Sequence, residues 1–360
     1  MRTFFTLPIL LLAAAPAFAQ DPLVVLAAAR AGRIEFFDET LAPIAGIGVN
    51  QLLESVTASP DGRRLYIAQE SQRNSGSCCG LFSLDLETKK MCLLATPALY
   101  GAPSPDGRFL FTQGKRGVDV FDAATLSRLP TMKAPGAYNL QPSPDGRWLL
   151  GVTNSPKPSL DIFDMKSGAL ARRLSIPAEP ATGVWGGDTF YIFSYGDPGK
   201  GQLWSVQPED TELSQAKPIA LPYLHGNCNE PVLLMLAGAP DELFLAEAFG
   251  FKVDRHLACP DAPGAGVYVI HPSTGRAAYS APSVRVHRMA ASPDGRDLYV
   301  LDSGGPSPPG NSRLLHIDPR TGRILHNTAL EPGDWNLALA HIPSALIPRR
   351  NVHAAASCSR

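Results

Sequence analysis

Polar and aromatic side chains recur at one kind of position in this 360-residue sequence, immediately ahead of short apolar segments. Carboxylates next to amides could hold a hard cation such as Ca²⁺, whose protein ligands are oxygen atoms. A histidine beside an arginine offers different chemistry, a general base next to an anion-binding guanidinium. The alternative is that these side chains only satisfy one another at a loop surface, where polarity is usual. The residues at this position are Glu54, Tyr100, Tyr138, Asn139, Glu230, His287, Arg288, Trp335 and Asn336.

Familiar catalytic motifs are missing from the sequence, which contains no Gly-x-Ser-x-Gly, no Gly-rich phosphate loop and no His-Glu-x-x-His. If the chain is an enzyme, we therefore expect its acid/base or metal groups among Glu54, Glu230 and His287. We expect the other residues of the set to contact a ligand: Tyr100, Tyr138, Asn139, Arg288, Trp335 and Asn336. His225, His256 and His287 could bind a transition metal only if the fold brings them together.

The six cysteines do not have the spacing of a metal or haem site. The sequence has no Cys-x-x-Cys, which argues against a thiolate metal centre, and no Cys-x-x-Cys-His, which argues against covalent haem. No cofactor is evident, apart from the Ca²⁺ that the oxygen-rich set could hold.

The first residues, "MRTFFTLPILLLAAAPAFAQ", have the features of a cleaved secretory signal. Arg2 precedes an apolar run, and the small-x-small Ala17-Phe18-Ala19 stands before Gln20. The run is shorter than the ~20 apolar residues that span a bilayer, and two prolines interrupt it. We expect residues 1–19 to be removed and the mature chain, residues 20–360, to be periplasmic or secreted without a membrane span. The 32 basic and 33 acidic residues leave a net charge of −1, which argues against nucleic-acid binding.

The phrase "SPDG" repeats, and each copy predicts a tight turn between two strands, because Pro, Asp and Gly each favour a turn position. A second mark, a short strand followed by a turn as in "VDVFDAAT", also occurs seven times. In five copies an Asp ends the strand and is expected to cap the turn. The capping residues are Asp38, Asp85, Asp122, Asp164 and Asp318, and the "SPDG" copies or their degenerate equivalents lie at Pro60, Pro105, Pro144, Gly187, Pro240, Pro293 and Pro343.

Seven units of this kind predict an all-β fold, a seven-bladed β-propeller that occupies residues 20–360 as one domain. The two sets of marks start out of phase, because the chain begins with the strands "LVVLAA" and "RIEFFDET" and ends with "WNLALAHI". We therefore expect one split blade, whose inner strand comes from the C-terminus and whose other three strands come from the N-terminus. This pairing would close the ring and remove exposed sheet edges.

The pattern "SPDGRxLYV" followed by "hxhhDxxTG" resembles the YVTN-type propellers, a large group of secreted and periplasmic proteins. Relatives in that group include sugar-lactone hydrolases and the heavy subunits of periplasmic amine dehydrogenases. The resemblance implies a propeller that binds a small ligand or a protein partner, as a non-catalytic subunit of a periplasmic oxidoreductase does. The alternative is a lactonase or other hydrolase with its active site at the mouth of the central channel.

The "SPDG" turns are expected on one face of the disc, the turn face, and the polar set on the opposite face, the loop face. Loops longer than ~12 residues inside a compact domain are more often functional than accidental. Three loops of about this length or longer extend the loop face, at residues 69–80, 247–266 and 302–312. We expect the ligand or partner to bind there.

In an exported chain the cysteines are expected to form disulfides. Cys228 and Cys259 both belong to the loop face of the fifth unit, so we expect them to pair. For the others two schemes stay open. In one, the adjacent Cys78 and Cys79 pair and leave Cys92 for Cys358; in the other, Cys92 pairs with Cys78 or Cys79.

Overall fold

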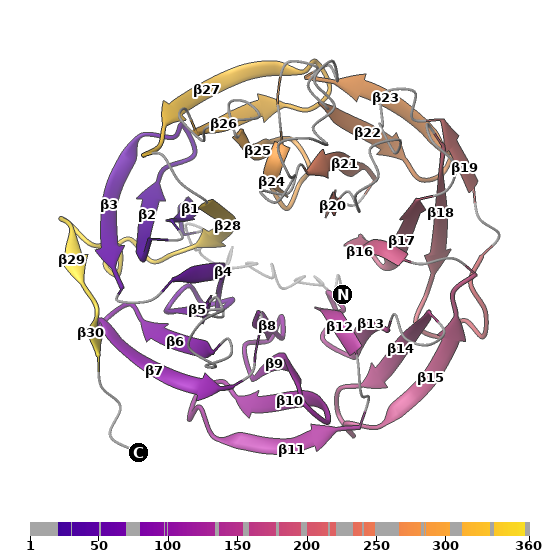
Figure 1. Cartoon of the computed structure of the whole chain (residues 1–360), viewed down its shortest axis with the longest axis horizontal. Helices are drawn as coiled ribbons and strands as arrows, with labels where there is room; N and C mark the ends of the chain where they lie inside the picture. The colour runs from indigo at the N-terminus through magenta and orange to yellow at the C-terminus, as the bar shows by residue number, and fades with distance from the viewer. Residues whose placement is uncertain are drawn as a thin grey trace, which may run out of the picture.

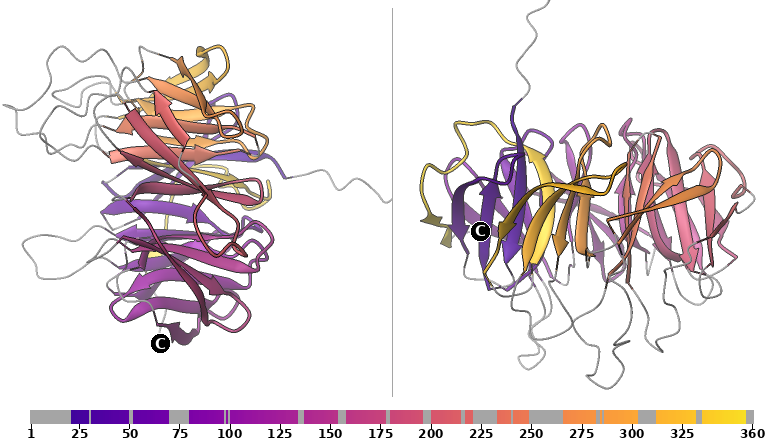
Figure 2. Two further views of the ribbon diagram at one scale, coloured as in Figure 1. Left: turned by 90° about the vertical axis from the view of Figure 1, so that its right-hand side faces the viewer. Right: turned by 90° about the horizontal axis from the view of Figure 1, so that it is seen from above.

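The computed structural model describes residues 21–29, 31–49, 52–69, 80–96, 98, 100–133, 137–153, 158–177, 180–195, 200–214, 217–220, 233–239, 241–248, 266–281, 284, 286–302, 312–331 and 335–356. They form seven antiparallel sheets arranged as blades around a central axis (Figure 1). Viewed from the side, the blades make a disc (Figure 2). Among the described residues, no helix has the length and apolar character needed to cross a membrane.

Each blade has an inner strand at the axis and an outer strand at the rim. Blade 1 contains β4 (Leu53–Ala58), β5 (Arg64–Gln69), β6 (Leu81–Asp85) and β7 (Lys90–Ala95). Blade 2 contains β8 (Ala102–Pro103), β9 (Phe109–Gly114), β10 (Gly117–Asp122) and β11 (Arg128–Met132). Blade 3 contains β12 (Ala137–Pro142), β13 (Trp148–Thr153), β14 (Ser159–Asp164) and β15 (Leu170–Ser175). Blade 4 contains β16 (Pro180–Gly186), β17 (Thr189–Tyr195), β18 (Lys200–Val206) and β19 (Lys217–Ala220).

The remaining blades complete the circle. Blade 5 contains β20 (Leu233–Gly238), β21 (Leu243–Ala248), β22 (Val267–His271) and β23 (Arg276–Ser280). Blade 6 contains β24 (Val286–Ala291), β25 (Leu298–Asp302), β26 (Arg313–Asp318) and β27 (Arg323–Ala329). Blade 7 is the split blade, with β28 (Trp335–His341) innermost, followed by β1 (Leu23–Ala29), β2 (Arg33–Phe37) and β3 (Pro43–Gly48).

The strands next to the inner ones are apolar on both faces, because each blade is packed between two others. In β1, Val24, Leu26 and Ala28 pack toward blade 1, whereas Val25 and Ala27 pack toward blade 6. The run "LVVLAAA" therefore lacks the alternation of a half-exposed strand. Seven clusters of buried side chains, one between each pair of neighbouring blades, make up the core of the described residues.

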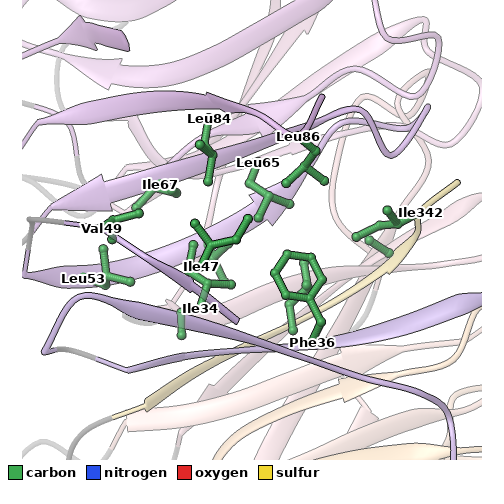
Figure 3. Packing of buried hydrophobic residues seen from close by; sticks show 14 of the residues in the cluster. Ile34, Phe36, Ile47, Val49, Leu53, Leu65, Ile67, Leu84, Leu86 and Ile342 are labelled. Atoms are coloured by element: carbon green, nitrogen blue, oxygen red, sulfur yellow. The ribbon is translucent and has the colours of Figure 1, made fainter. Parts of the chain in front are cut away.

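The split blade confirms the predicted closure of the ring. β28 pairs antiparallel with β1, from Leu23 opposite His341 to Ala29 opposite Trp335. The cluster between blades 7 and 1 then joins Ile34 and Phe36 to Leu65 and Ile67 (Figure 3). Residues from both ends of the chain therefore complete one continuous core.

A strap beyond the last inner strand was not expected from the sequence. After β28 the chain crosses to the rim, where β29 (Val352–His353) pairs in parallel with β3 and β30 (Ala355–Ala356) pairs in parallel with β7. The Ala354 N–H donates to the Gly48 carbonyl and the Ala355 N–H donates to the Lys89 carbonyl, both at 2.9 Å. The strap, residues 343–356, thus joins blade 7 to blade 1 from outside (Figure 1).

Cys92, on β7, is disulfide-bonded. The other five cysteines, Cys78, Cys79, Cys228, Cys259 and Cys358, lie outside the described residues. In the register of β30, Ala356 lies opposite Met91, the residue before Cys92. This register favours the predicted Cys92–Cys358 pair, and the pairing scheme stays a prediction.

The "SPDG" turns share one hydrogen-bond pattern, which explains why the whole phrase repeats. The Ser59 hydroxyl donates to Asp61 Oδ1 at 2.6 Å and accepts the Arg64 N–H at 2.9 Å. Ser104 and Asp106, Ser143 and Asp145, and Ser292 and Asp294 repeat the first contact. The serine, whose role the sequence did not indicate, therefore links the aspartate to the start of the next strand.

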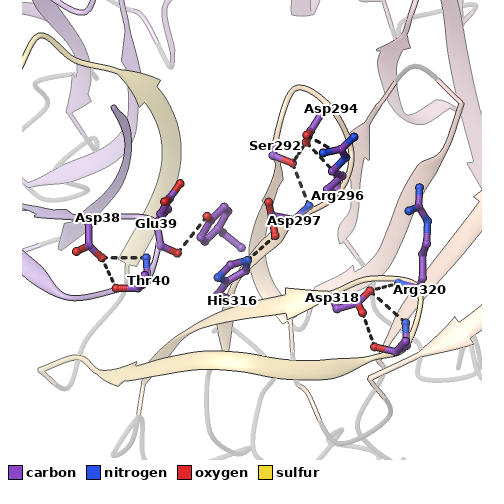
Figure 4. Close-up of polar contacts among 12 residues, drawn as sticks. Asp38, Glu39, Thr40, Ser292, Asp294, Arg296, Asp297, His316, Asp318 and Arg320 are labelled. Carbon is purple, nitrogen blue, oxygen red and sulfur yellow. Dashed lines mark hydrogen bonds and ion pairs between the residues drawn. The ribbon is translucent and has the colours of Figure 1, made fainter. Parts of the chain in front are cut away.

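The aspartates of the second turn are caps, as predicted. Asp122 accepts the Thr125 N–H at 2.7 Å and the Thr125 hydroxyl at 2.8 Å, and Asp164 accepts the same two groups from Ser167. Asp38 makes the equivalent contacts with Thr40 (Figure 4). Asp318 accepts the Thr321 hydroxyl at 2.7 Å.

Acid should destabilise the protein through these caps. Hydrogen bonds from Thr125 and Ser167 hold the pKa values of Asp122 and Asp164 below the usual aspartate value, and the Thr321 hydroxyl does the same for Asp318. Because these pKa values are lower in the folded chain, their stabilising effect is complete above the unfolded value of about 4 and is lost as the pH falls further. Urea unfolding between about pH 7 and pH 3 measures this loss. The triple variant D122N/D164N/D318N should lose less stability over that range, and an unchanged loss would contradict the assignment.

Two glycines of the repeated turn should respond differently to alanine. Both have positive φ, Gly62 at 64° and Gly146 at 69°, but an added Cβ at Gly62 would lie 2.1 Å from the His341 carbonyl oxygen, whereas Gly146 has nothing within 4 Å. Gly146→Ala should cost about 1–2 kcal/mol through the left-handed backbone alone. Gly62→Ala should cost about 1–3 kcal/mol more, because the end of β28 must shift. Equal losses in denaturant unfolding would show that the blade 1 turn does not support the closing strand.

Candidate functional site

The predicted site residues occupy the loop-face ends of the inner strands. Several of them lie near the start of these strands and not in the loops before them: Glu54 in β4, His287 and Arg288 in β24, and Asn336 in β28. Tyr100, in contrast, precedes β8. The register of β4 shifts at Glu54 and that of β24 shifts at His287. Such bulges redirect side chains and are common beside functional sites. A bulge depends on how two strands pair with each other, so the sequence did not predict it.

The predicted residues of blades 2 and 3 bond to neighbouring blades. The Tyr100 hydroxyl accepts a hydrogen bond from the Leu140 N–H at 2.8 Å. Leu140 lies where the register of β12 shifts. Asn139 has a φ of 49° and its amide donates to the Gly183 carbonyl at 3.4 Å. These contacts give Tyr100 and Asn139 a structural role between blades, and ligand binding by either residue stays a prediction.

Two further inter-blade contacts of this kind involve residues that the sequence analysis did not single out. The Thr57 hydroxyl donates to the Gly101 carbonyl at 2.9 Å, and Trp185 Nε1 donates to the Gln141 carbonyl at 3.3 Å. The acceptor lies 44 residues from the donor in each pair, close to the length of one repeat. That spacing is the only signal in the sequence that could have indicated them.

Arg288 is held in place across the junction of blades 6 and 7. Its Nε donates to Asn336 Oδ1 at 3.0 Å, and its Nη1 donates to the His287 carbonyl at 3.0 Å. Both of these acceptors are neutral oxygen atoms. Because the Asn336 amide oxygen faces Arg288, its NH₂ group points to another side. The sequence predicted both residues as ligand contacts but not their contact with each other.

His287 is buried, with 9% of its surface exposed. Burial, and then the positive charge of Arg288, lower its pKa to about 3. The imidazole is therefore neutral in the physiological range, and it is a weaker base than an ordinary histidine. The predicted general-base role of His287 stays a prediction, and its low basicity weighs against that role.

Other candidates cannot be placed in the same way. Glu230 and the side chains of Tyr138 and Trp335 lie outside the described residues. Within the part of the chain that the structure describes, no group of three or more His, Cys, Asp or Glu side chains could hold a metal ion. The predicted Ca²⁺ site depends on Glu230 together with Glu54, so it stays a prediction.

The strands that flank the three long loops belong to blades 1, 5 and 6. Gln69 N–H donates to the Gly80 carbonyl at 2.7 Å at the base of the first, and Gly266 N–H donates to the Tyr279 hydroxyl at 3.0 Å beside the second. At the third, the buried Asp302 accepts a hydrogen bond from Arg313 Nε at 3.1 Å. Glu54 and Arg288 belong to two of these blades, 1 and 6, and Asn336 belongs to blade 7 between them. One sector, blades 5, 6, 7 and 1, therefore contains both the strands that flank the long loops and the charged residues.

Away from the channel, His316 belongs to a structural contact. Its Nε2 lies 2.7 Å from Asp297 Oδ1 (Figure 4). Its ring stacks on those of Tyr299 and His326. The Tyr299 hydroxyl donates to the Glu39 carbonyl of blade 7 at 3.2 Å. These contacts reinforce the junction of blades 6 and 7 at a distance from the channel.

Comparison with known proteins identifies the fold and no more specific group. No family model matches the chain, and none of the curated proteins does. Among solved structures, a chain of the Kuenenia stuttgartiensis hydrazine synthase superposes with a TM-score of 0.57 at 17% identity, covering 74% of this chain and 76% of that one. The dihydro-heme d1 dehydrogenase NirN superposes with a TM-score of 0.58 at 16% identity, covering 94% of this chain and 79% of that one. A Desulfotomaculum acetoxidans protein of unknown function superposes with a TM-score of 0.59 at 13% identity, covering 89% of this chain and 99% of that one.

These similarities confirm the predicted seven-bladed propeller and place it among propellers of varied function. At such low identities they carry the fold alone. Membership of the YVTN-type group stays a prediction from the repeat motifs.

The protonation state of His287 provides a direct test of the site. With a pKa of about 3, its ring should show no titration between about pH 5 and pH 8. NMR of histidine-labelled protein, with the resonance assigned by His287→Gln, measures this. Because Arg288 contributes to the shift, Arg288→Gln should raise the pKa of His287. A midpoint near 6.5 in the unmodified protein would contradict the buried, neutral state.

Proposed function

We propose that this protein is an exported, periplasmic β-propeller that binds a small anionic ligand at the mouth of its channel, between blades 6 and 7. The observation that carries the proposal is the fixed guanidinium of Arg288, held by Asn336 Oδ1 and the His287 carbonyl. The signal-like first residues and the propeller repeats support the location, and the repeats also support a binding role.

The geometry suits an oxyanion for two reasons. A guanidinium whose orientation is already fixed loses little entropy when it binds a carboxylate, and it can donate two parallel hydrogen bonds. The partly buried position of Arg288 also strengthens its electrostatic attraction for an anion relative to an exposed residue. His287 is neutral and adds no second positive charge, so the described groups match a singly charged group such as a carboxylate.

A partner protein is a second candidate for the same face. The three long loops are rooted around the sector that contains Arg288, and two of the similar structures bear the names of redox enzymes. The sequence has no covalent haem motif, which fits a subunit without a redox centre, as the resemblance to amine dehydrogenase heavy subunits implies. Copurification of a second polypeptide from the native periplasm would support this role.

The lactonase or hydrolase alternative requires Glu54, Glu230 and His287 to act together. The register shifts at Glu54 and His287 are its support, and the low pKa of His287 weighs against it. Lactone hydrolysis that is abolished by Glu230→Gln or by a chelator would favour this alternative over a binding protein.

Substitution of Arg288 tests anion binding. The probe is benzoate, a singly charged carboxylate, titrated against protein with labelled arginine side chains and followed by NMR. Benzoate should shift the Arg288 Nε resonance, and Arg288→Gln should weaken binding at least tenfold, because it removes the charge-assisted bonds.

The matched control is Arg108→Gln on the turn face, where Arg108 pairs with Asp106 and 71% of its side chain is exposed. This variant should bind benzoate as the unmodified protein does. Equal binding by Arg288→Gln, or equal loss in both variants, would overturn the proposal.

A further inference from the structure

The C-terminal strap covers outer strands that could otherwise pair with another chain. In a propeller the inner strands face the channel, but the outer strand of every blade is a sheet edge, with unpaired N–H and C=O groups. In the described residues, the strap runs parallel to β3 at Ile47 and Gly48, and parallel to β7 at Lys90 and Met91. It thereby protects two neighbouring edges at the junction that closes the ring.

The interiors of these two edges have little protection of their own. Between its first and last residues, β3 reads "IAGI" and β7 reads "MCLL", with neither a charge nor a proline. Three of the other outer strands do have such features: Pro130 lies within β11, Pro218 within β19, and Arg172 and Arg173 within β15. Charges and prolines at edges are the usual means by which sheets avoid pairing with other molecules.

The edge of β3 is shaped to accept the strap. A Cβ added to Gly48 would lie 2.5 Å from His353 Nδ1, and a Cβ added to Gly46 would lie 3.2 Å from Asn351 Oδ1. The glycines therefore leave space that residues of the strap fill. Leu346, Ile347 and Val352 also pack against the cluster between blades 7 and 1. Lys89 Nζ donates to the Leu346 carbonyl at 3.1 Å, which fixes the strap to blade 1.

We propose that the strap is an edge guard: without it, β3 and β7 become a surface through which two copies of this chain associate, edge to edge. The occupant of that surface is a second copy, because the apolar side chains Ile44 and Leu93, exposed at 39% and 44%, lie on these same two strands and would be matched by their own counterparts. The strap itself demonstrates that these edges accept an additional strand. This inference does not depend on the proposed ligand site.

Two variants remove the guard in different ways. The first is the chain ended at Pro348, which keeps the packed Leu346 and Ile347 but lacks β29 and β30. The second is the full-length A354P/A355P, which removes the N–H groups that donate to Gly48 and Lys89 and keeps the rest of the strap. Light scattering after size exclusion, with reductant present so that Cys92 forms no intermolecular disulfide, measures the mass. At equal concentration, both variants should have at least twice the average mass of the unmodified chain.

Substitutions on the edges decide whether the association uses them. In the shortened chain, Ile44→Lys with Leu93→Lys should restore the mass of the unmodified protein, because charges oppose edge pairing. The matched control is Ile324→Lys on β27, an outer strand outside the strap, where Ile324 is exposed at 37%. It should leave the raised mass unchanged.

Three outcomes would overturn the proposal. The first is an unchanged mass in both variants, and the second is a raised mass that persists after the double lysine substitution. The third is circular dichroism that shows both variants unfolded, which would make the strap a requirement for folding. A shortened chain that unfolds while A354P/A355P folds and self-associates would still support the proposal, because the second variant retains the packed part of the strap.

Discussion

The structure depends on one constraint: the two faces of each blade are both apolar and must both be covered. In blade 7 the alternate residues of β1 belong to two different clusters, one shared with blade 1 and one shared with blade 6. A blade by itself would expose both surfaces to water, at a cost of about 25 cal/mol for each Å² of apolar area. Stability therefore belongs to the closed ring, and the pairing of β28 with β1 completes the two interfaces of blade 7 at once.

Closure also assembles the candidate site. Arg288 comes from the penultimate repeat, and Asn336, which orients it, comes from the C-terminal strand that the N-terminal strands hold in place. Glu54 follows on the next blade, where β28 lies beside β4. The charged part of the channel mouth thus exists only when both ends of the chain meet, which links anion binding to an intact ring.

Closure of the ring leaves the outer strand of each blade as a sheet edge, and these edges are protected in different ways. Some outer strands contain proline or arginine, whereas β3 and β7 are covered by residues 351–356 of the strap. The covered edges are those of the two blades joined at the closure. The same short segment therefore reinforces the closing junction and shields its outer surface.

The repeat, the number of blades, the split blade and the capping aspartates could all be predicted from the sequence, because turns and strands carry local signals that recur about once per blade. The sequence also selected Arg288 and Asn336 as polar residues of one face. Three properties became visible in the folded chain alone: Arg288 and Asn336 contact each other, Tyr100 and Asn139 bond to neighbouring blades, and His287 is neutral. These properties arise from contacts between blades, from shifts of register and from burial. The strap was likewise decided by tertiary contacts, since a few residues that pair with the rim carry no periodic signal of their own.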